Sequence, residues 1–180
     1  MPTESTQYIM RRDVGTSLYA GLLFAVLGSV AWATGQPFIF PSLGPSAFLL
    51  AFERETGRKR RYRIVASHII GGVAGFVAHA ILASGVVITM TPPAFSVEGL
   101  RLAASATLSV VATSGAMIAT DTVHAPACAT TLIVSLGLLS TPAQVVIISV
   151  SVVVLVEFHA GVLAGYRRLV GDKHPLYDGK

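Results

Sequence analysis

One stretch, residues 121–132, could bind a ligand: it interrupts an apolar part of the chain with a carboxylate, an imidazole, a proline and hydroxyls. Pro126 suits the first turn of a helix, because proline has no N–H to lose there. A helix start also offers unpaired N–H groups and the positive end of the helix dipole, which favour a small anion. The candidate ligands in this stretch are His124, Pro126, Ala127, Cys128, Thr130 and Thr131.

An earlier stretch, residues 41–50, has a similar pattern of prolines, small residues and a hydroxyl followed by apolar residues. Its candidate ligands are Gly44, Pro45 and Ser46. We interpret the two stretches as paired half-helices whose starts face each other. In such a site the backbone N–H groups, more than the imidazole of His124, are expected to hold the anion.

Three ionisable groups could couple or gate transport. His124 could bond the anion, carry a coupled proton or cap the backbone, and Asp121 could orient its ring. A local Asp–His hydrogen bond without function is the alternative. Glu157 lies in an apolar segment and is a functional candidate for that reason, although it could also pair with a nearby arginine.

Composition places the chain among integral membrane proteins. Hydrophobic residues make up 53% of it and charged residues 12%, with a mean hydropathy of +0.69. Soluble domains carry about 25% charged residues. The net charge of +4 does not indicate nucleic acid, because the basic residues cluster beside apolar segments. The lone Cys128 excludes an intrachain disulfide and a cysteine-based zinc site, and we expect no metal or cofactor.

The apolar segments predict an all-α membrane bundle of four long spans and two short, proline-broken half-helices. The long spans are residues 16–34, 64–90, 99–120 and 143–166, and the short segments are 38–52 and 127–139. Residues 1–15 and 167–180 are expected to be cytoplasmic segments flanking a transmembrane domain over 16–166. Gly71 and Gly75 form a GxxxG face, which predicts a close helix contact.

If both short segments cross the membrane, the chain makes six crossings. All of its 13 Lys and Arg residues except Arg101 then fall on one side, which the positive-inside rule makes the cytoplasm. Both termini are then cytoplasmic, and we expect the plasma membrane. Each half, over about 16–90 and 99–166, consists of a long span, a short segment and a second long span. This order is consistent with two inverted repeats.

The motifs resemble those of the HPP family of small integral membrane proteins. The family's His-Pro-Pro followed by Ala-Gly-Ala-Thr-Ala is similar to residues 124–131, its Gly-Ser segment to residues 44–50, and its Gly-His motif to residues 67–72. The resemblance implies a four-span family fold and, from plant chloroplast members, nitrite transport. This sequence departs from the motif at Ala125 and Cys128, which bears on the substrate.

We therefore expect a transporter or channel for a small inorganic anion, nitrite-like, in contact with the lipid bilayer and able to form homo-oligomers. One alternative is a non-transporting interaction or sensor subunit whose basic segment, residues 53–63, contacts a partner or anionic lipid. Another is a membrane enzyme that uses His124 and Asp121. Nucleic acid is not an expected partner, and no catalytic residues are assigned.

Overall fold

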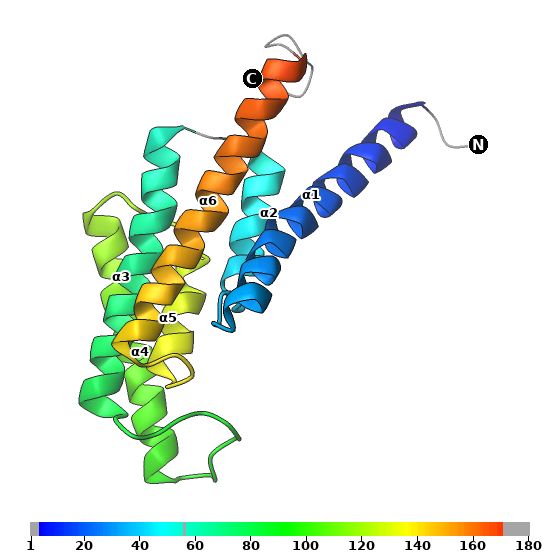
Figure 1. Cartoon of the computed structure of the whole chain (residues 1–180). Coiled ribbons are helices and arrows are strands. Elements are labelled where there is room, and N and C mark those ends of the chain that lie inside the picture. Colours follow the sequence, from blue (N-terminus) through cyan, green and yellow to red (C-terminus); the bar gives the residue numbers. More distant parts are fainter. Residues whose placement is uncertain (1–3, 56, 171–180) are drawn as a thin grey trace.

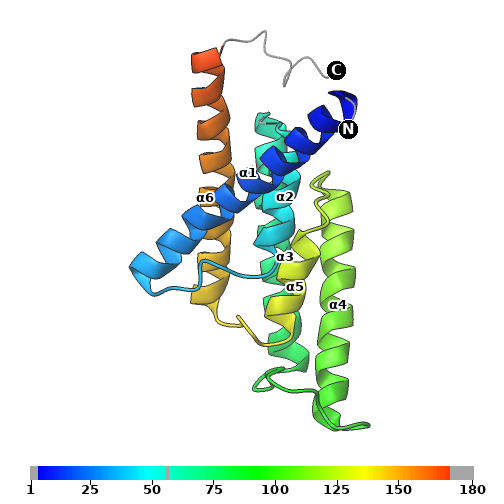
Figure 2. The ribbon, with the colours of Figure 1, turned by 90° about the vertical axis from the view of Figure 1, so that its right-hand side faces the viewer.

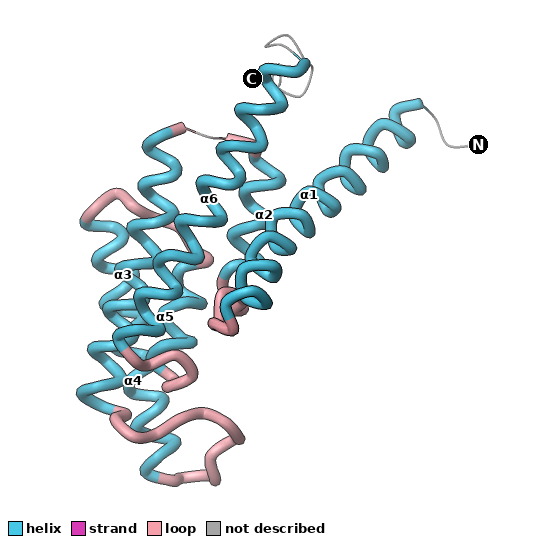
Figure 3. The backbone as a smooth tube through the Cα atoms, viewed as in Figure 1, coloured by secondary structure: helices cyan, strands magenta, loops and turns pink. Residues whose placement is uncertain are grey.

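The computed structural model describes residues 4–55 and 57–170, and within these residues it contains helices and loops but no strand (Figure 3). The helices are α1 (Glu4–Thr34), α2 (Leu43–Glu53), α3 (Arg58–Leu82), α4 (Val97–Ala119), α5 (Ala127–Ser135) and α6 (Pro142–Val170). The predicted tail 167–180 falls partly on α6 and, from residue 171, outside the described residues.

Four helices of the described chain are long and apolar enough to cross a membrane: α3, α4 and the main parts of α1 and α6. The helices α2 and α5 are too short to do so alone. The predicted all-α membrane bundle of four long and two short helices is therefore confirmed.

Several element boundaries differ from the prediction: α1 begins at Glu4 and not at residue 16, and α3 ends at Leu82 and not at residue 90. Residues 58–63, expected in a loop, form the first turns of α3. Arg and Lys are good helix formers, and their long side chains can reach the polar end of the bundle from a helical backbone. Helix α5 ends at Ser135 and not at residue 139, because Gly137 takes a left-handed conformation with φ of 84°.

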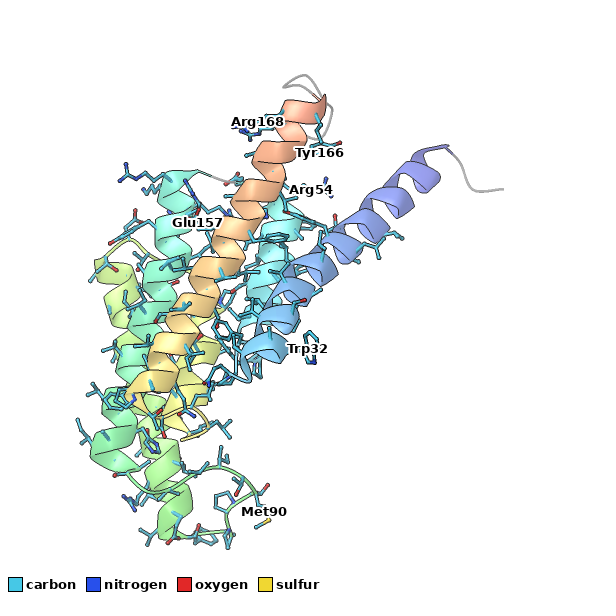
Figure 4. The ribbon with its side chains drawn as sticks, viewed as in Figure 1. Trp32, Arg54, Met90, Glu157, Tyr166 and Arg168 are labelled. Atoms are coloured by element: carbon cyan, nitrogen blue, oxygen red, sulfur yellow. The ribbon has the colours of Figure 1, made fainter. Side chains whose placement is uncertain are left out.

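The starts of α1 and α3 and the ends of α2 and α6 lie at one end of the molecule (Figures 1 and 2). We call this the basic end, because α3 brings five basic residues there. They are Arg58, Lys59, Arg60, Arg61 and Arg63. Arg168, near the end of α6, also lies there, whereas Met90 lies in the loop at the opposite end (Figure 4). At that opposite end, the guanidinium of Arg101 donates to the carbonyls of Leu82 and Ser84 and so caps α3.

The half-helices run in opposite directions from the middle of the bundle. From its first residue α2 runs toward the basic end, whereas α5 runs away from it, so the two occupy different halves of the molecule (Figure 2). Apolar side chains of α1, α2 and α6 pack together and fix α2 in place. This cluster includes Leu23, Leu27, Leu43, Leu50, Ile148, Val152 and Leu155.

Helix α5 packs directly on the glycine face of α3. A methyl group at Gly71 would lie 2.8 Å from the carbonyl oxygen of Ala127, and one at Gly75 would lie 2.6 Å from that of Thr131. Only a residue without a Cβ permits this approach. The close contact predicted for Gly71 and Gly75 is confirmed, and it brings the start of α5 beside the middle of α3.

Candidate functional site

Five side chains from α2, α3, α5 and the α4–α5 loop form one hydrogen-bonded series, which we call the buried polar chain. Thr130 Oγ1 lies 2.8 Å from Ser42 Oγ and 2.7 Å from His68 Nδ1. Ser46 Oγ lies 3.0 Å from His68 Nε2 and 3.0 Å from His124 Nε2. The series therefore runs Ser42, Thr130, His68, Ser46, His124.

The start of α2 supplies both serines. Ser42 is the N-cap residue, and Ser46 lies one turn later on the same face. Both are fully buried. Leu43 and Leu50, on the apolar face of α2, pack against α1 and α6. The polar face of α2 therefore turns toward α3 and α5.

The glycine contact between α3 and α5 positions the other members. His68 is one turn before Gly72 on α3, and Thr130 is in the first turn of α5. The side chains of His68 and Thr130 are fully buried, and His124 is 8% exposed. Burying such groups without partners would cost on the order of 2–7 kcal/mol each. The hydrogen bonds between them offset this cost.

The start of α5 differs from the expectation of unpaired backbone N–H groups. The N–H groups of Ala127, Cys128 and Ala129 donate to the carbonyls of residues 124–126 at 3.0–3.1 Å. The loop before the helix coils tightly after His124, so its carbonyls occupy the donors. The backbone of α5 is therefore not the free anion ligand that the sequence suggested, and side chains are the available ligands.

A vestibule of about 200 Å³ opens beside His124 at the basic end. Its wall is formed by Leu49, Glu53, Arg60, Arg63, Ile64, Val123, His124 and Ala125. Arg60 forms ion pairs with Glu53 and Glu55. Arg63, in contrast, forms no ion pair or hydrogen bond with any residue in 4–55 or 57–170, and its Nε is buried. The vestibule thus holds a guanidinium without a hydrogen-bonded partner in the described chain, and its charge also acts on Asp121.

The same charges affect His124. Burial, followed by the positive charges of Arg60 and Arg63, lowers the pKa of His124 to about 4. The imidazole is therefore neutral at physiological pH, and it can donate through one ring nitrogen and accept through the other.

This pKa predicts a pH-dependent stability. The folded protein prefers neutral His124, so the contribution is complete above the ordinary pKa of 6.5 and is lost as the pH falls toward 4. We expect the melting temperature in detergent to fall across this interval and His124→Gln to flatten part of the fall. An equally steep profile in the variant would show that other groups cause it.

The predicted ligand residues separate into two groups. The structure brings Ser46, His124 and Thr130 together. Thr131 instead bonds to Thr113 of α4 at 2.9 Å. The remaining predicted ligands shape the backbone at the starts of the half-helices. Of these, Pro126 and Ala127 are buried, Gly44 and Cys128 are half-buried, and Pro45 is exposed.

The carboxylates proposed for coupling or gating pair with basic residues instead. Asp121 does not orient His124: it lies 2.9 Å from Lys59, both side chains being about three-quarters exposed. The amino group of Lys59 lowers the pKa of Asp121. Glu157 lies 2.9 Å from Arg61. Both contacts hold the basic end of α3 against its neighbours, which is the structural alternative considered for Glu157.

We therefore expect Asp121→Asn to change little. Solvent and salt screen an exposed pair, so stability and the expected anion uptake should remain close to those of the wild type. Thermal unfolding and uptake by the same preparation measure both. A large loss of uptake with an unchanged melting temperature would show that Asp121 belongs to the functional site after all.

Four important residues were not among the predicted ligands: Ser42, Arg60, Arg63 and His68. His68 and His79 are both buried on α3, and His79 bonds to the carbonyl of Ser135, which ends α5. The signal for His68 was its position one turn before a buried glycine face. Among the described residues, no group of three or more His, Cys, Asp or Glu could hold a metal ion.

Comparison with protein families identifies a match over nearly the whole chain. The model of a family described as "HPP, transmembrane region" matches residues 2–169. No curated protein and no solved structure matches the chain significantly.

Proposed function

The chain belongs to the HPP transmembrane family, and from this premise we propose that it is a transporter or channel for a small inorganic anion such as nitrite, in the plasma membrane. The observation that carries the proposal is the vestibule. Arg63, which has no ion-pair partner in the described chain, lies at its basic entrance, and its wall includes His124, where the buried polar chain begins.

The charges of the vestibule favour an anion. Arg60 forms ion pairs with both Glu53 and Glu55, whereas Arg63 forms no ion pair or hydrogen bond within the described chain and can take a bound anion as its direct partner. A partly buried charge without a partner is costly, and a bound anion would remove that cost. The neutral imidazole of His124 can donate a hydrogen bond to the same anion.

The size and shape of the site favour a small, planar anion. A volume of about 200 Å³ accommodates an ion of a few atoms and some water, and Leu49 and Ile64 make part of the wall apolar. A guanidinium binds two oxygen atoms of one group in parallel, which suits nitrite and formate better than a halide. The proposed substrate class is therefore a planar anion with two adjacent oxygen atoms.

The arrangement of helices supports the same function. We propose that the basic end faces the cytoplasm and that α1–α3 and α4–α6 are inverted repeats. The opposite directions of α2 and α5 from the middle of the bundle fit that relation, which is frequent in secondary transporters. The anion would then enter from the basic end and pass between the starts of the half-helices.

Uptake by the purified protein tests this proposal. Proteoliposomes are given nitrite, formate, nitrate or chloride in turn, and the folded state is checked by the thermal unfolding of the same preparation. We expect uptake of nitrite and formate above that of protein-free vesicles, with chloride slowest. Folded protein that takes up none of the four would refute the proposal.

A further inference from the structure

We propose that the buried polar chain conducts a proton that enters with the anion, with Ser46 as the relay and His68 as the inner acceptor. The inference rests on the proposed anion transport and adds proton coupling to it. What carries it is the position of one hydroxyl between two imidazole nitrogens, within hydrogen-bond distance of both.

The hydroxyl of Ser46 has a single hydrogen. It can therefore donate to only one acceptor at a time, and when it donates to one Nε2 atom it accepts from the other. The carbonyl oxygen of Ser42, to which Ser46 can also donate, competes for this hydrogen but lies farther away, at 3.3 Å against 3.0 Å for either imidazole. The two histidines are thus linked by a bridge that can reverse its direction, which is what proton transfer along hydrogen bonds requires.

The rest of the chain sets the resting direction. Thr130 donates its hydroxyl hydrogen to Ser42 Oγ, so it must accept from the Nδ1–H of His68. Neutral His68 then carries no hydrogen on Nε2, and that nitrogen accepts from Ser46. Ser46 in turn accepts from the Nε2–H of His124. The Nδ1 of His124, in the wall of the vestibule, is left without a hydrogen.

The transfer step balances. A proton from the vestibule binds Nδ1 of His124, and the hydrogen on Nε2 of that ring passes to Ser46 Oγ. The original hydroxyl hydrogen of Ser46 passes at the same time to Nε2 of His68. His124 ends neutral with its hydrogen on Nδ1, Ser46 is unchanged, and His68 is an imidazolium that still donates to Thr130. The proton moves on when the Nδ1 hydrogen of His68 passes to Thr130 and the hydroxyl hydrogen of Thr130 passes to Ser42, which releases its own hydroxyl hydrogen and leaves His68 neutral.

The charged groups around the entrance link this proton to the anion. Arg60 and Arg63 of α3 face His124, while Glu53 of α2 is paired with Arg60. Lys59 and Asp121 form their own exposed pair, and the ring centroids of His124 and His68 are 5.4 Å apart. The two arginines oppose protonation of the chain. An anion beside Arg63 offsets their field, so protonation becomes favourable when the anion is bound.

Simultaneous measurement of anion uptake and internal pH tests the proposal. Proteoliposomes containing a pH-sensitive dye receive nitrite, and the variants are Ser46→Ala and His68→Gln. Ser67→Ala is the matched control, because Ser67 is equally buried, adjoins His68 and bonds only to a backbone carbonyl. We expect the wild type and the control to acidify the vesicles as nitrite enters, and Ser46→Ala to move fewer protons per nitrite taken up than either of them.

Each other outcome is decisive. Wild-type nitrite uptake without proton movement would overturn proton coupling and leave anion transport intact. Acidification that persists in both Ser46→Ala and His68→Gln would overturn the assigned path. Absence of nitrite uptake by folded wild-type protein would remove the proposed function and this inference together.

A measurement on the unmodified protein covers the case in which the variants fail to fold. The ¹⁵N resonances of the histidine rings report which nitrogen carries hydrogen. We expect neutral His68 with its hydrogen on Nδ1 and its Nε2 accepting a hydrogen bond. The opposite tautomer would overturn the assigned direction of the chain.

Discussion

Replacing Arg63 by glutamine is expected to lower the uptake of nitrite or formate by about 10- to 100-fold at low anion concentration. The reason is that a hydrogen bond to a charged group contributes about 1.5–3 kcal/mol, and each 1.4 kcal/mol corresponds to a factor of ten. Glutamine keeps a polar side chain of similar length but removes the charge that attracts the anion. Initial uptake rates over a range of anion concentrations measure the change.

Arg58→Gln is the matched control for this variant. Arg58 is on the same helix and also at the basic end, but it is exposed and does not line the vestibule. We expect its uptake to stay within about a factor of two of the wild type, because an exposed charge is screened by salt. Equal losses in the two variants would mean that only the general charge of the basic end matters, and the specific role of Arg63 would be wrong.

The second large effect is expected from Gly75→Ala, and it concerns stability. The added methyl group would meet the backbone oxygen of Thr131 at 2.6 Å and the Cβ of Val134 at 2.9 Å. These atoms belong to a helix and cannot rotate away, so α5 must shift. Overpacking of this kind costs about 1–3 kcal/mol, against a gain of up to about 1 kcal/mol in helix propensity. We expect a lower melting temperature, by about 2–8 °C.

Gly115→Ala separates the contact from the helix propensity. Gly115 is also inside a long helix, but nothing lies within 4 Å of the position of its missing Cβ. Its replacement should leave the melting temperature unchanged or raise it slightly, because only the propensity term remains. If Gly75→Ala were as stable as Gly115→Ala, α3 and α5 could not be packed as described.

The sequence was sufficient for the fold because the helical signals are local. Long apolar runs, the prolines at the half-helices and the GxxxG pair each act within a few turns, and together they predicted four long and two short helices. The same local pattern predicted that Ser46, His124 and Thr130 belong to one site. These residues follow the prolines or adjoin them, and the starts of the half-helices do meet.

What the sequence did not predict depends on contacts between distant segments. The role of His68 depends on its hydrogen bonds with Ser46 and Thr130, which are 22 and 62 positions away in the sequence. No periodicity in α3 reveals these contacts. Arg63 looks like one member of a basic run, and only the three-dimensional arrangement shows that it lines the vestibule while Lys59, Arg60 and Arg61 form ion pairs. The hydrogen bonds from the N–H groups at the start of α5 to the loop carbonyls likewise depend on how the preceding loop coils.

The proposed transport therefore depends on side chains more than on helix ends. In this proposal an anion is attracted by Arg63, meets the imidazole of His124, and is accompanied by a proton that moves through Ser46 to His68. The departure of Ala125 and Cys128 from the family motif leaves each of these groups in place, since neither residue belongs to the buried polar chain.

The most direct test of the central claim is whether the anion occupies the vestibule. Ala125 is exposed and lines it, so Ala125→Cys in a Cys128→Ser background provides a single reactive position. The rate of its modification by a negatively charged thiol reagent is measured with and without nitrite, beside Phe95→Cys in the loop at the opposite end. The account predicts that nitrite slows the reaction at residue 125 and leaves that at residue 95 unchanged. An unchanged rate at residue 125, in protein that takes up nitrite, would contradict it.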